Sequence, residues 1–128
     1  MDTYVVDTHA LAWFIARSAR LSRRAAEVLR KAEQGKASVL VPTVVLAELL
    51  YISERKRVPV SLTEILNRIG SGGCFQVVPF DWAVFERMMK ISKALEIHDR
   101  IIVATAEVYG AKVISKDEWI KRATAIVW

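Results

Sequence analysis

The 128-residue chain contains a single cysteine, Cys74, which rules out a disulfide within the chain and fits a reducing, cytoplasmic environment. No apolar run approaches the ~20 residues that a membrane-spanning helix requires, so no association with a membrane is expected. No signal peptide is visible, because Met1 and Asp2 lead directly into a strand-like segment. Internal repeats, low-complexity tracts and linkers are also absent, and residues 1–128 are predicted to form a single domain.

The composition favours a buried sheet and a polyanionic partner. Apolar residues make up 53% of the chain and the mean hydropathy is +0.25, as expected for a sheet covered on both faces. The formal charge of +5 and the pI near 9.6 indicate a partner such as RNA, although solvated helix faces explain any single basic residue equally well. The basic residues form two clusters: Arg17, Arg20, Arg23, Arg24, Arg30, Lys31 and Lys36, then Arg55, Lys56 and Arg57.

Short β-branched runs alternate with helical patterns along the whole chain. The predicted strands are residues 3–7, 38–41, 75–78, 112–115 and 125–128. Helices are predicted between them, with capping residues at Ser22, Ser61 and Asp81. Because parallel strands need right-handed helical crossovers, this alternation predicts an α/β fold. We expect a three-layer α/β/α sandwich with a mostly parallel central sheet.

Two of the predicted helices carry specific expectations. The helix after Asp81 is predicted to be long, with a core stripe formed by Trp82, Phe85, Met88, Met89 and Leu95. The helix at Asp99 is apolar on nearly every face and must be packed on most sides. Asp99 is predicted to cap its start, and Gly110 to end it in a left-handed conformation.

Four acidic residues stand out by their sequence context. Asp7 ends the first strand, Glu48 interrupts an apolar helix, Asp99 opens another, and Asp117 follows the fourth strand. Each one alone is explained by a helix cap or a surface salt bridge. Four acids flanked by core-type sequence in a basic protein favour a shared site. Since helix N-termini and strand C-termini lie on the same edge of an α/β sheet, Asp99 and Asp117 are predicted to share one rim.

The donor chemistry of this group indicates a hard metal ion. Carboxylates with one cysteine and only two imidazoles, His9 and His98, favour Mg²⁺ or Mn²⁺ over zinc. Such an ion activates water and neutralises charge that develops on a phosphodiester. If the acids converge, each raises the pKa values of the others.

The ordered motifs resemble those of PIN domains, and specifically of VapC-type toxins from toxin–antitoxin pairs. The matching segments are Asp7 to Leu11 (DTHAL), Ala47 to Leu49 (AEL), Asp99 to Ala106 (DRIIVATA), Val113 to Asp117 (VISKD) and Ile126 to Trp128 (IVW). Each segment alone is a weak signal. Their order and spacing along the whole chain make the resemblance specific.

The resemblance implies a metal-dependent endoribonuclease that hydrolyses RNA, forms a homodimer and is inhibited by a cognate antitoxin. It implies that Asp7, Glu48 and Asp99 are the principal catalytic acids and ligands of Mg²⁺ or Mn²⁺, with Asp117 as the fourth. Ser115 matches the hydroxyl residue of the family's Ser/Thr-x-Asp element. Two roles are open for Thr8, a hydrogen bond to Asp7 or contact with a metal-bound water.

Two further residues near these acids are predicted to have structural roles. His9 is expected to be a structural histidine, and Arg100 to pair with a neighbouring acid, with a phosphate contact as the alternative. Other phosphate chemistries fit less well. A haloacid-dehalogenase phosphatase needs a second aspartate where His9 stands, and a receiver domain needs an acid pair at the first strand. The remaining alternative is a degenerate PIN domain that only binds RNA or protein.

Overall fold

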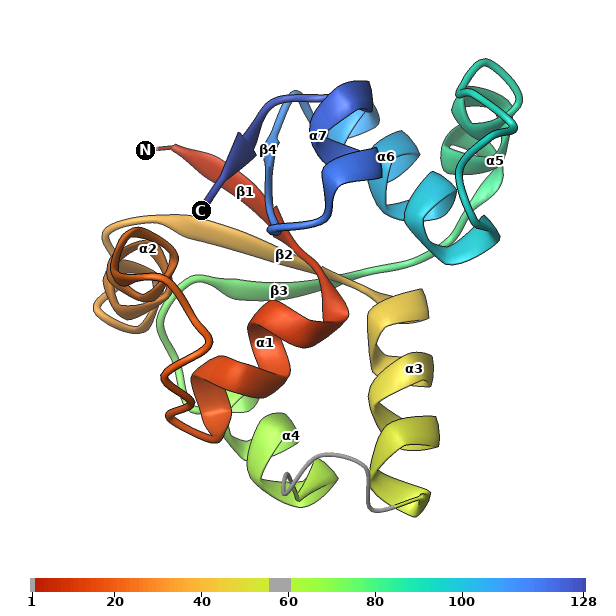
Figure 1. The fold of residues 1–128 in the computed structure, drawn as a ribbon. Coiled ribbons are helices and arrows are strands. Elements are labelled where there is room, and N and C mark those ends of the chain that lie inside the picture. The colour runs from red at the N-terminus through yellow and green to blue at the C-terminus, as the bar shows by residue number, and fades with distance from the viewer. Residues whose placement is uncertain (1, 56–60) are drawn as a thin grey trace.

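The computed structural model describes residues 2–55 and 61–128 (Figure 1). Five strands form one sheet in the order β3-β2-β1-β4-β5, and every neighbouring pair is parallel. The strands are β1 (Thr3–Val6), β2 (Ser38–Pro42), β3 (Phe75–Val78), β4 (Lys112–Ile114) and β5 (Ile126–Val127). The helices are α1 (Thr8–Ile15), α2 (Arg23–Glu33), α3 (Thr43–Glu54), α4 (Leu62–Gly70), α5 (Trp82–Met88), α6 (Ile97–Tyr109) and α7 (Glu118–Ala123).

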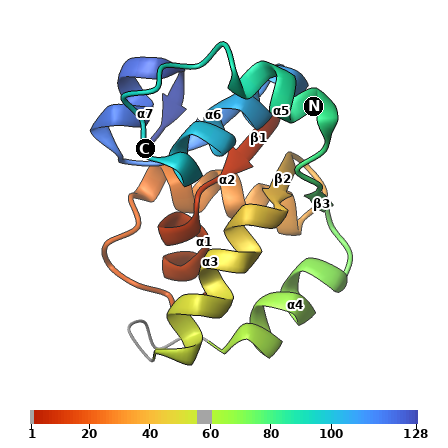
Figure 2. The ribbon, with the colours of Figure 1, turned by 90° about the vertical axis from the view of Figure 1, so that its right-hand side faces the viewer.

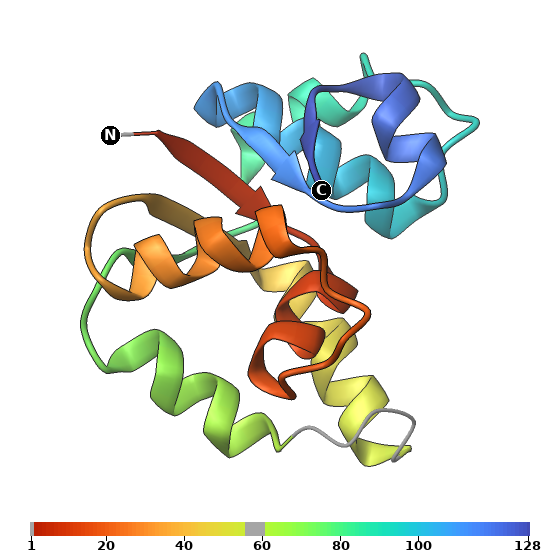
Figure 3. The same cartoon turned by 60° about the vertical axis from the view of Figure 1, so that its left-hand side comes forward.

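Helices cover both faces of the sheet, as predicted. The connections β1 to β2 and β2 to β3 place α1–α4 on one face, and Figures 1 and 3 show α5–α7 on the other. The strand order runs outward from β1 in both directions, so the chain changes direction between β1 and β4. In parallel α/β sheets, such a switch point opens a crevice at the carboxyl ends of the two strands. The topology therefore makes the edge of the sheet beyond β1 and β4 the candidate site.

The central strands are buried on both faces, which explains their continuous β-branched sequences. Val5 and Val6 of β1 have no exposed surface, and neither have Val113 and Ile114 of β4. Residues 101–106 of α6 are also buried without interruption, as its apolar sequence predicted. Gly110 ends α6 in the left-handed conformation (φ 62°, ψ 37°), again as predicted.

The predicted core stripe after Asp81 is only partly correct, since Leu95 is buried and Met88 packs half-buried against Val84, but the other three residues are exposed. Asp81 does cap α5, since its side chain accepts a hydrogen bond from Val84 N, but the helix ends at Met88. Its buried residue is Val84, and of the predicted stripe only Leu95 is buried. Trp82, Phe85 and Met89 are exposed, with 69% of Trp82 accessible to solvent. Figure 2 shows α5 beside α6, and packing on α6 covers one side of α5. The aromatic side chains of α5 remain exposed.

The apolar helix α3 is less buried than its sequence suggests. Val45 and Leu49 are buried, but Leu50 and Tyr51 are exposed and 30% of the Glu48 side chain is accessible to solvent. Glu48 is thus half-buried, because one side of α3 has no neighbouring element among the described residues. Among those residues, no helix is both long enough and apolar enough to cross a membrane.

Candidate functional site

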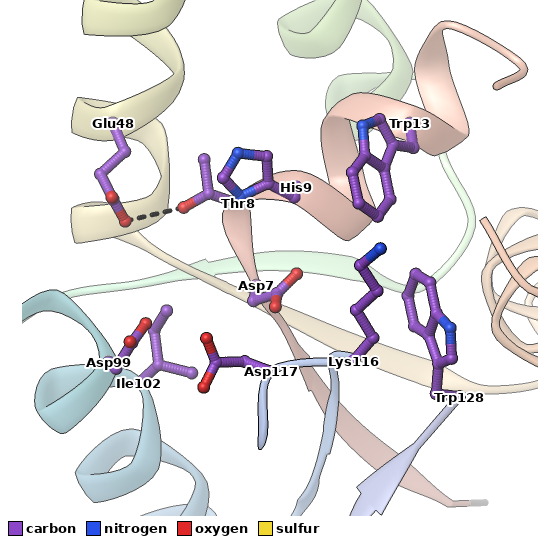
Figure 4. Close-up of a pocket in the computed structure, with 10 residues that line it drawn as sticks. All are labelled: Asp7, Thr8, His9, Trp13, Glu48, Asp99, Ile102, Lys116, Asp117 and Trp128. Carbon is purple, nitrogen blue, oxygen red and sulfur yellow. Dashed lines mark hydrogen bonds between the residues drawn. The ribbon is translucent and has the colours of Figure 1, made fainter. Parts of the chain in front are cut away.

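A cavity of about 300 Å³ lies at the switch point, beyond the carboxyl ends of β1 and β4 (Figure 4). All four predicted acids line it, and each comes from a different part of the fold. Asp7 joins β1 to α1, and Asp117 precedes α7, while Glu48 and Asp99 reach the cavity from α3 and α6. Its other lining residues are Thr8, His9, Trp13, Ile102, Lys116 and Trp128.

Asp7 has two roles at the end of β1. It is the N-cap residue of α1, and its Oδ1 accepts a 2.9 Å hydrogen bond from Ala10 N. Burial raises the pKa of Asp7, while hydrogen bonds from the Ser115 side chain and the Ala10 backbone oppose this change. The nearby charge of Asp117 makes a smaller contribution that also raises the pKa. Desolvation, more than the expected crowding of acids, therefore dominates at Asp7.

Thr8 positions Glu48 across the cavity. The buried Thr8 hydroxyl donates a 2.7 Å hydrogen bond to Glu48 Oε1. Of the two roles open for Thr8, the bond to Asp7 is therefore replaced by one to Glu48, and contact with a metal-bound water stays a prediction. The other carboxylate oxygen, Glu48 Oε2, lies 3.8 Å from His98 Nδ1, and that nitrogen is 2.7 Å from Glu96 Oε1. Glu48 thus faces the cavity between a hydroxyl from α1 and an imidazole from α6.

Asp99 lies in the first turn of α6, but it is not the cap. Glu96 is the N-cap residue instead, and its side chain accepts hydrogen bonds from the backbone N–H groups of His98 and Asp99. The Asp99 carboxyl is therefore left to face the cavity. Burial, followed by the charges of Asp117, Glu96, Glu48 and Asp7, raises its pKa from 3.8 to about 6. The predicted mutual effect of converging acids is present at Asp99.

Ser115 fixes the backbone that carries Asp117. Its side chain is completely buried, and Ser115 Oγ accepts a 3.0 Å hydrogen bond from Asp117 N. Asp117 in turn caps α7, because its Oδ1 accepts hydrogen bonds from Trp119 N and Ile120 N. One Asp117 carboxylate oxygen is thus occupied by the N-terminus of α7. The Ser115 hydroxyl interacts with both Asp117 N and the Asp7 side chain, and so links the two acids.

The role predicted for Arg100 needs correction, whereas that of His9 stays a prediction. His9 is exposed at the cavity, where its ring contacts Trp13 with centroids 5.6 Å apart. Arg100 Nε donates to the Met88 carbonyl oxygen at 3.1 Å. Among the described residues Arg100 forms no ion pair, so the predicted acidic partner is absent there.

A second cavity of about 540 Å³ adjoins the first and shares His9, Trp13 and Glu48 with it. Arg20 of the first basic cluster lines this second cavity. In the other cluster, Arg55 lies over the Tyr51 ring at 3.5 Å from its centroid. Lys56 and Arg57 lie outside the described residues.

Sequence reasoning missed four residues of the site: Trp13, Ile102, Lys116 and Trp128. Trp13, Lys116 and Trp128 each had a positional signal. Lys116 stands between Ser115 and Asp117, and Trp128 follows β5, the neighbour of β4. Trp13 is four residues after His9, which places both on one side of α1. Residues beyond the carboxyl ends of central strands, or one turn from such residues, are candidates for the site.

The donor set fits Mg²⁺ or Mn²⁺ in chemistry. All four acidic side chains supply oxygen, and no other kind of strong ligand except His9 lines the cavity. Within residues 2–55 and 61–128, no three Asp, Glu, His or Cys side chains are grouped closely enough to form a ready metal cage. Magnesium does not require such a cage, since it keeps several waters and takes one or two carboxylates together with substrate phosphate.

Comparison with known proteins identifies the family. The model of the PIN domain family matches residues 4–126, almost the entire chain. The chain belongs to the PIN domain family. None of the curated proteins compared with it matches by sequence.

Solved structures share the fold of this PIN domain at low sequence identity. VapBC2 from Rickettsia felis, bound to a DNA fragment of its promoter, is 13% identical with a TM-score of 0.71, over 97% of this chain and 96% of that one. VapC20 from Mycobacterium tuberculosis, a toxin that cleaves the sarcin–ricin loop, is 16% identical with a TM-score of 0.65, over 93% of both chains. FitAcB from Neisseria gonorrhoeae is 19% identical with a TM-score of 0.63, over 96% and 95%. At these identities the likeness establishes the fold.

Proposed function

We propose that this PIN domain protein is a metal-dependent endoribonuclease and the toxin of a toxin–antitoxin pair. One observation carries the proposal. Four carboxylates from four separate elements line a single cavity at the topological switch point of the sheet. Helix capping accounts for the positions of Asp7 and Asp117, but it does not explain why Glu48 and Asp99, which cap no helix, face the same cavity.

Asp7, Glu48, Asp99 and Asp117 are the residues that would hold Mg²⁺ or Mn²⁺, which when bound supplies an activated water and neutralises charge on a phosphodiester. The chain's own residues prepare this site. Thr8 orients Glu48 through its 2.7 Å hydrogen bond, and Ser115 fixes the backbone of Asp117. With a pKa of about 6, Asp99 is ionised in most molecules at pH 7, as a metal ligand must be.

RNA is the proposed substrate because the protein is basic and the toxin VapC20 of the same fold cleaves the sarcin–ricin loop. The test is cleavage of single-stranded RNA with EDTA and with Mg²⁺ or Mn²⁺. We expect cleavage to require the divalent ion and to be lost in Asp7→Asn. Asparagine retains an oxygen that can cap α1, so this variant should keep its fold. Cleavage in excess chelator would contradict the proposal.

The same test separates the proposal from its main alternative. A degenerate PIN domain would bind RNA or protein and would not cleave RNA with any divalent ion. Binding without cleavage, in wild-type protein shown to be folded, would favour that alternative. The antitoxin partner is proposed from the VapBC2 complex of the same fold, and a reading frame for a small partner protein next to this gene would support it.

We also propose that the protein forms a homodimer through the exposed side of α5. Phe80, Trp82, Phe85 and Met89 form an apolar patch there, in which the Trp82 and Phe85 rings lie 5.4 Å apart and those of Phe80 and Phe85 6.5 Å apart. At ~200 Å² per aromatic side chain, the patch exposes roughly 400 Å². This is about half of what each partner buries in a standard interface.

The charges around α5 favour a second copy of the chain as the occupant. Asp81 precedes α5 and Glu86 lies within it, whereas Lys90 and Lys93 follow its end. When the two-fold axis is perpendicular to α5, the two copies of the helix run antiparallel, and the acidic residues of one copy lie towards the basic residues of its partner. A self-complementary surface of this kind is what an isologous dimer requires.

A further inference from the structure

Lys116 differs from the other residues of the acidic cavity because it brings a positive charge among four carboxylates. Its Nζ lies over the Trp13 ring, 4.9 Å from the centroid. Trp128 packs edge-on against Trp13 with centroids 5.9 Å apart. In Figure 4 the Lys116 side chain extends beside these two rings, on the side of the cavity away from Glu48 and Asp99.

The position of Lys116 is fixed by its neighbours in the chain and by the ring it contacts. On one side Ser115 is completely buried, and on the other Asp117 caps α7. Trp13 is only 8% exposed, so its indole ring is a rigid support. A flexible lysine stem that already lies on a fixed surface loses less entropy when it binds a ligand.

Contact with an indole ring also leaves the charge of the ammonium group available. A cation–π interaction attracts the cation without neutralising it, unlike an ion pair with a carboxylate. Among the described residues, no carboxylate lies within ion-pairing distance of Lys116 Nζ. The cavity is therefore acidic on the side of Glu48 and Asp99 and carries, on the side of Trp13 and Trp128, a cation that forms no ion pair among the described residues.

We propose that Lys116 contacts a non-bridging phosphate oxygen of the RNA at the acidic cavity, with Trp13 as the residue that positions it. This inference rests on the proposed ribonuclease function. Four carboxylates repel a phosphodiester, and a cation held on the opposite side of the cavity reduces this repulsion where the phosphate must enter. Lysine acts on phosphate as a point charge, so the contact contributes to affinity for every RNA sequence.

The test measures RNA binding without divalent ions, so that it does not depend on cleavage. Single-stranded RNA is titrated in EDTA at several salt concentrations against wild type, Lys116→Met and Lys116→Arg. The plot of log K against log salt has a negative slope, and loss of one phosphate contact should make this slope shallower by about 0.7. Binding of different sequences should weaken to a similar extent. Lys116→Arg keeps the charge and should retain the slope.

Lys112→Met is the matched control. Lys112 is an exposed lysine at the opposite end of β4, and its loss changes the net charge by the same amount. We expect the salt slope of Lys112→Met to equal that of wild type. If Lys116→Met and Lys112→Met have the same slope, Lys116 does not contact phosphate and the inference is overturned. If the wild type neither binds nor cleaves RNA under any condition, the proposed function fails together with the inference.

The role of Trp13 is tested by a double-mutant cycle on the same slope. Trp13→Phe keeps a ring but offers a weaker cation–π surface. If Trp13 acts through Lys116, the variant that combines Trp13→Phe with Lys116→Met should have the slope of Lys116→Met alone. Additive changes would show that Trp13 acts on RNA independently of Lys116. If Trp13→Phe fails to fold, the Lys116 variants still test the phosphate contact, because Lys116 is exposed and its replacement should leave the fold intact.

Discussion

Thr8 and Glu48 are forty residues apart in the sequence and are joined by a 2.7 Å hydrogen bond at the edge of the acidic cavity. The bond connects α1 to α3 and orients a carboxylate that is partly accessible to solvent. Thr8 itself is buried, so its hydroxyl is held in place by the packing around it. Hydroxyl groups that orient a metal ligand in this way influence the site without contacting the metal.

Thr8→Val should therefore weaken metal binding more than it weakens the fold. Valine has the shape of threonine without the hydroxyl donor, and loss of such a hydrogen bond costs about 1 kcal/mol of unfolding free energy. We expect the affinity for Mn²⁺ to fall by about tenfold or more, as measured by titration calorimetry. Thr8→Ser keeps the donor and should bind Mn²⁺ nearly as wild type. Equal affinities for Thr8→Val and wild type would exclude Glu48 orientation as the function of Thr8.

Asp99 should make the stability of the metal-free protein depend on pH. Its folded-state pKa of about 6 lies above the unfolded value, so protonation of Asp99 stabilises the fold. This contribution is complete below pH about 4 and is lost as the pH rises through about 6. In the Asp99→Asn variant, the neutral amide imitates the protonated carboxyl at all pH values. In EDTA, this variant should thus melt higher than wild type at pH 7, with a difference that disappears towards pH 4.

Melting curves across this pH range, with and without Mn²⁺, test the prediction. A bound ion should stabilise wild type by mass action, roughly 2.7 kcal/mol at a hundredfold excess over Kd, and should stabilise Asp99→Asn much less. If the difference between the two metal-free proteins is the same at pH 4 and pH 7, the Asp99 carboxyl is not destabilised in the folded state.

Trp82 should determine the oligomeric state. Trp82→Ser removes the most exposed ring of the α5 patch, and we expect a monomer where the wild type is a dimer in light scattering coupled to size exclusion. Trp119→Ser is the matched control, since Trp119 is 54% exposed on α7 and lies outside the patch. A wild-type monomer, or a Trp82→Ser dimer of unchanged affinity, would mean that α5 does not pair with a second copy.

Gly73→Ala should destabilise the fold more than Gly35→Ala. Both glycines have left-handed backbone angles, with φ of 77° at Gly73 and 75° at Gly35, so the two variants share the conformational cost. A Cβ atom at Gly73 would lie 2.7 Å from the Ala32 carbonyl oxygen, whereas one at Gly35 would meet nothing within 4 Å. We expect Gly73→Ala to lose about 1–3 kcal/mol more unfolding free energy in urea. Equal losses would mean that the backbone at Ala32 moves aside freely.

The sequence by itself was sufficient to predict the layers of the fold and to single out the four acids by the apolar residues around them. Apolar β-branched runs such as residues 112–114 specify strands buried on both faces, and their alternation with helical patterns leaves a parallel sheet as the simplest arrangement. In such a sheet Asp7 and Asp117, each following a central strand, must come to the same edge. These properties depend on the local pattern of apolar residues and on the handedness of crossovers, and both can be inferred from a single sequence.

Contacts between residues distant in sequence required the tertiary structure. An apolar stripe does not reveal whether a neighbour covers it, and Trp82 and Phe85 remained exposed because α6 packs on the other side of α5. Which acid caps α6 depended on where the helix begins, because it starts at Ile97 and Glu96 accepts the hydrogen bonds of the first turn, which leaves Asp99 inside that turn. The pairing of Lys116 with Trp13 likewise arises only when β4 lies beside β1 and brings the two residues to one cavity, since side-chain neighbours follow from strand order and not from sequence separation.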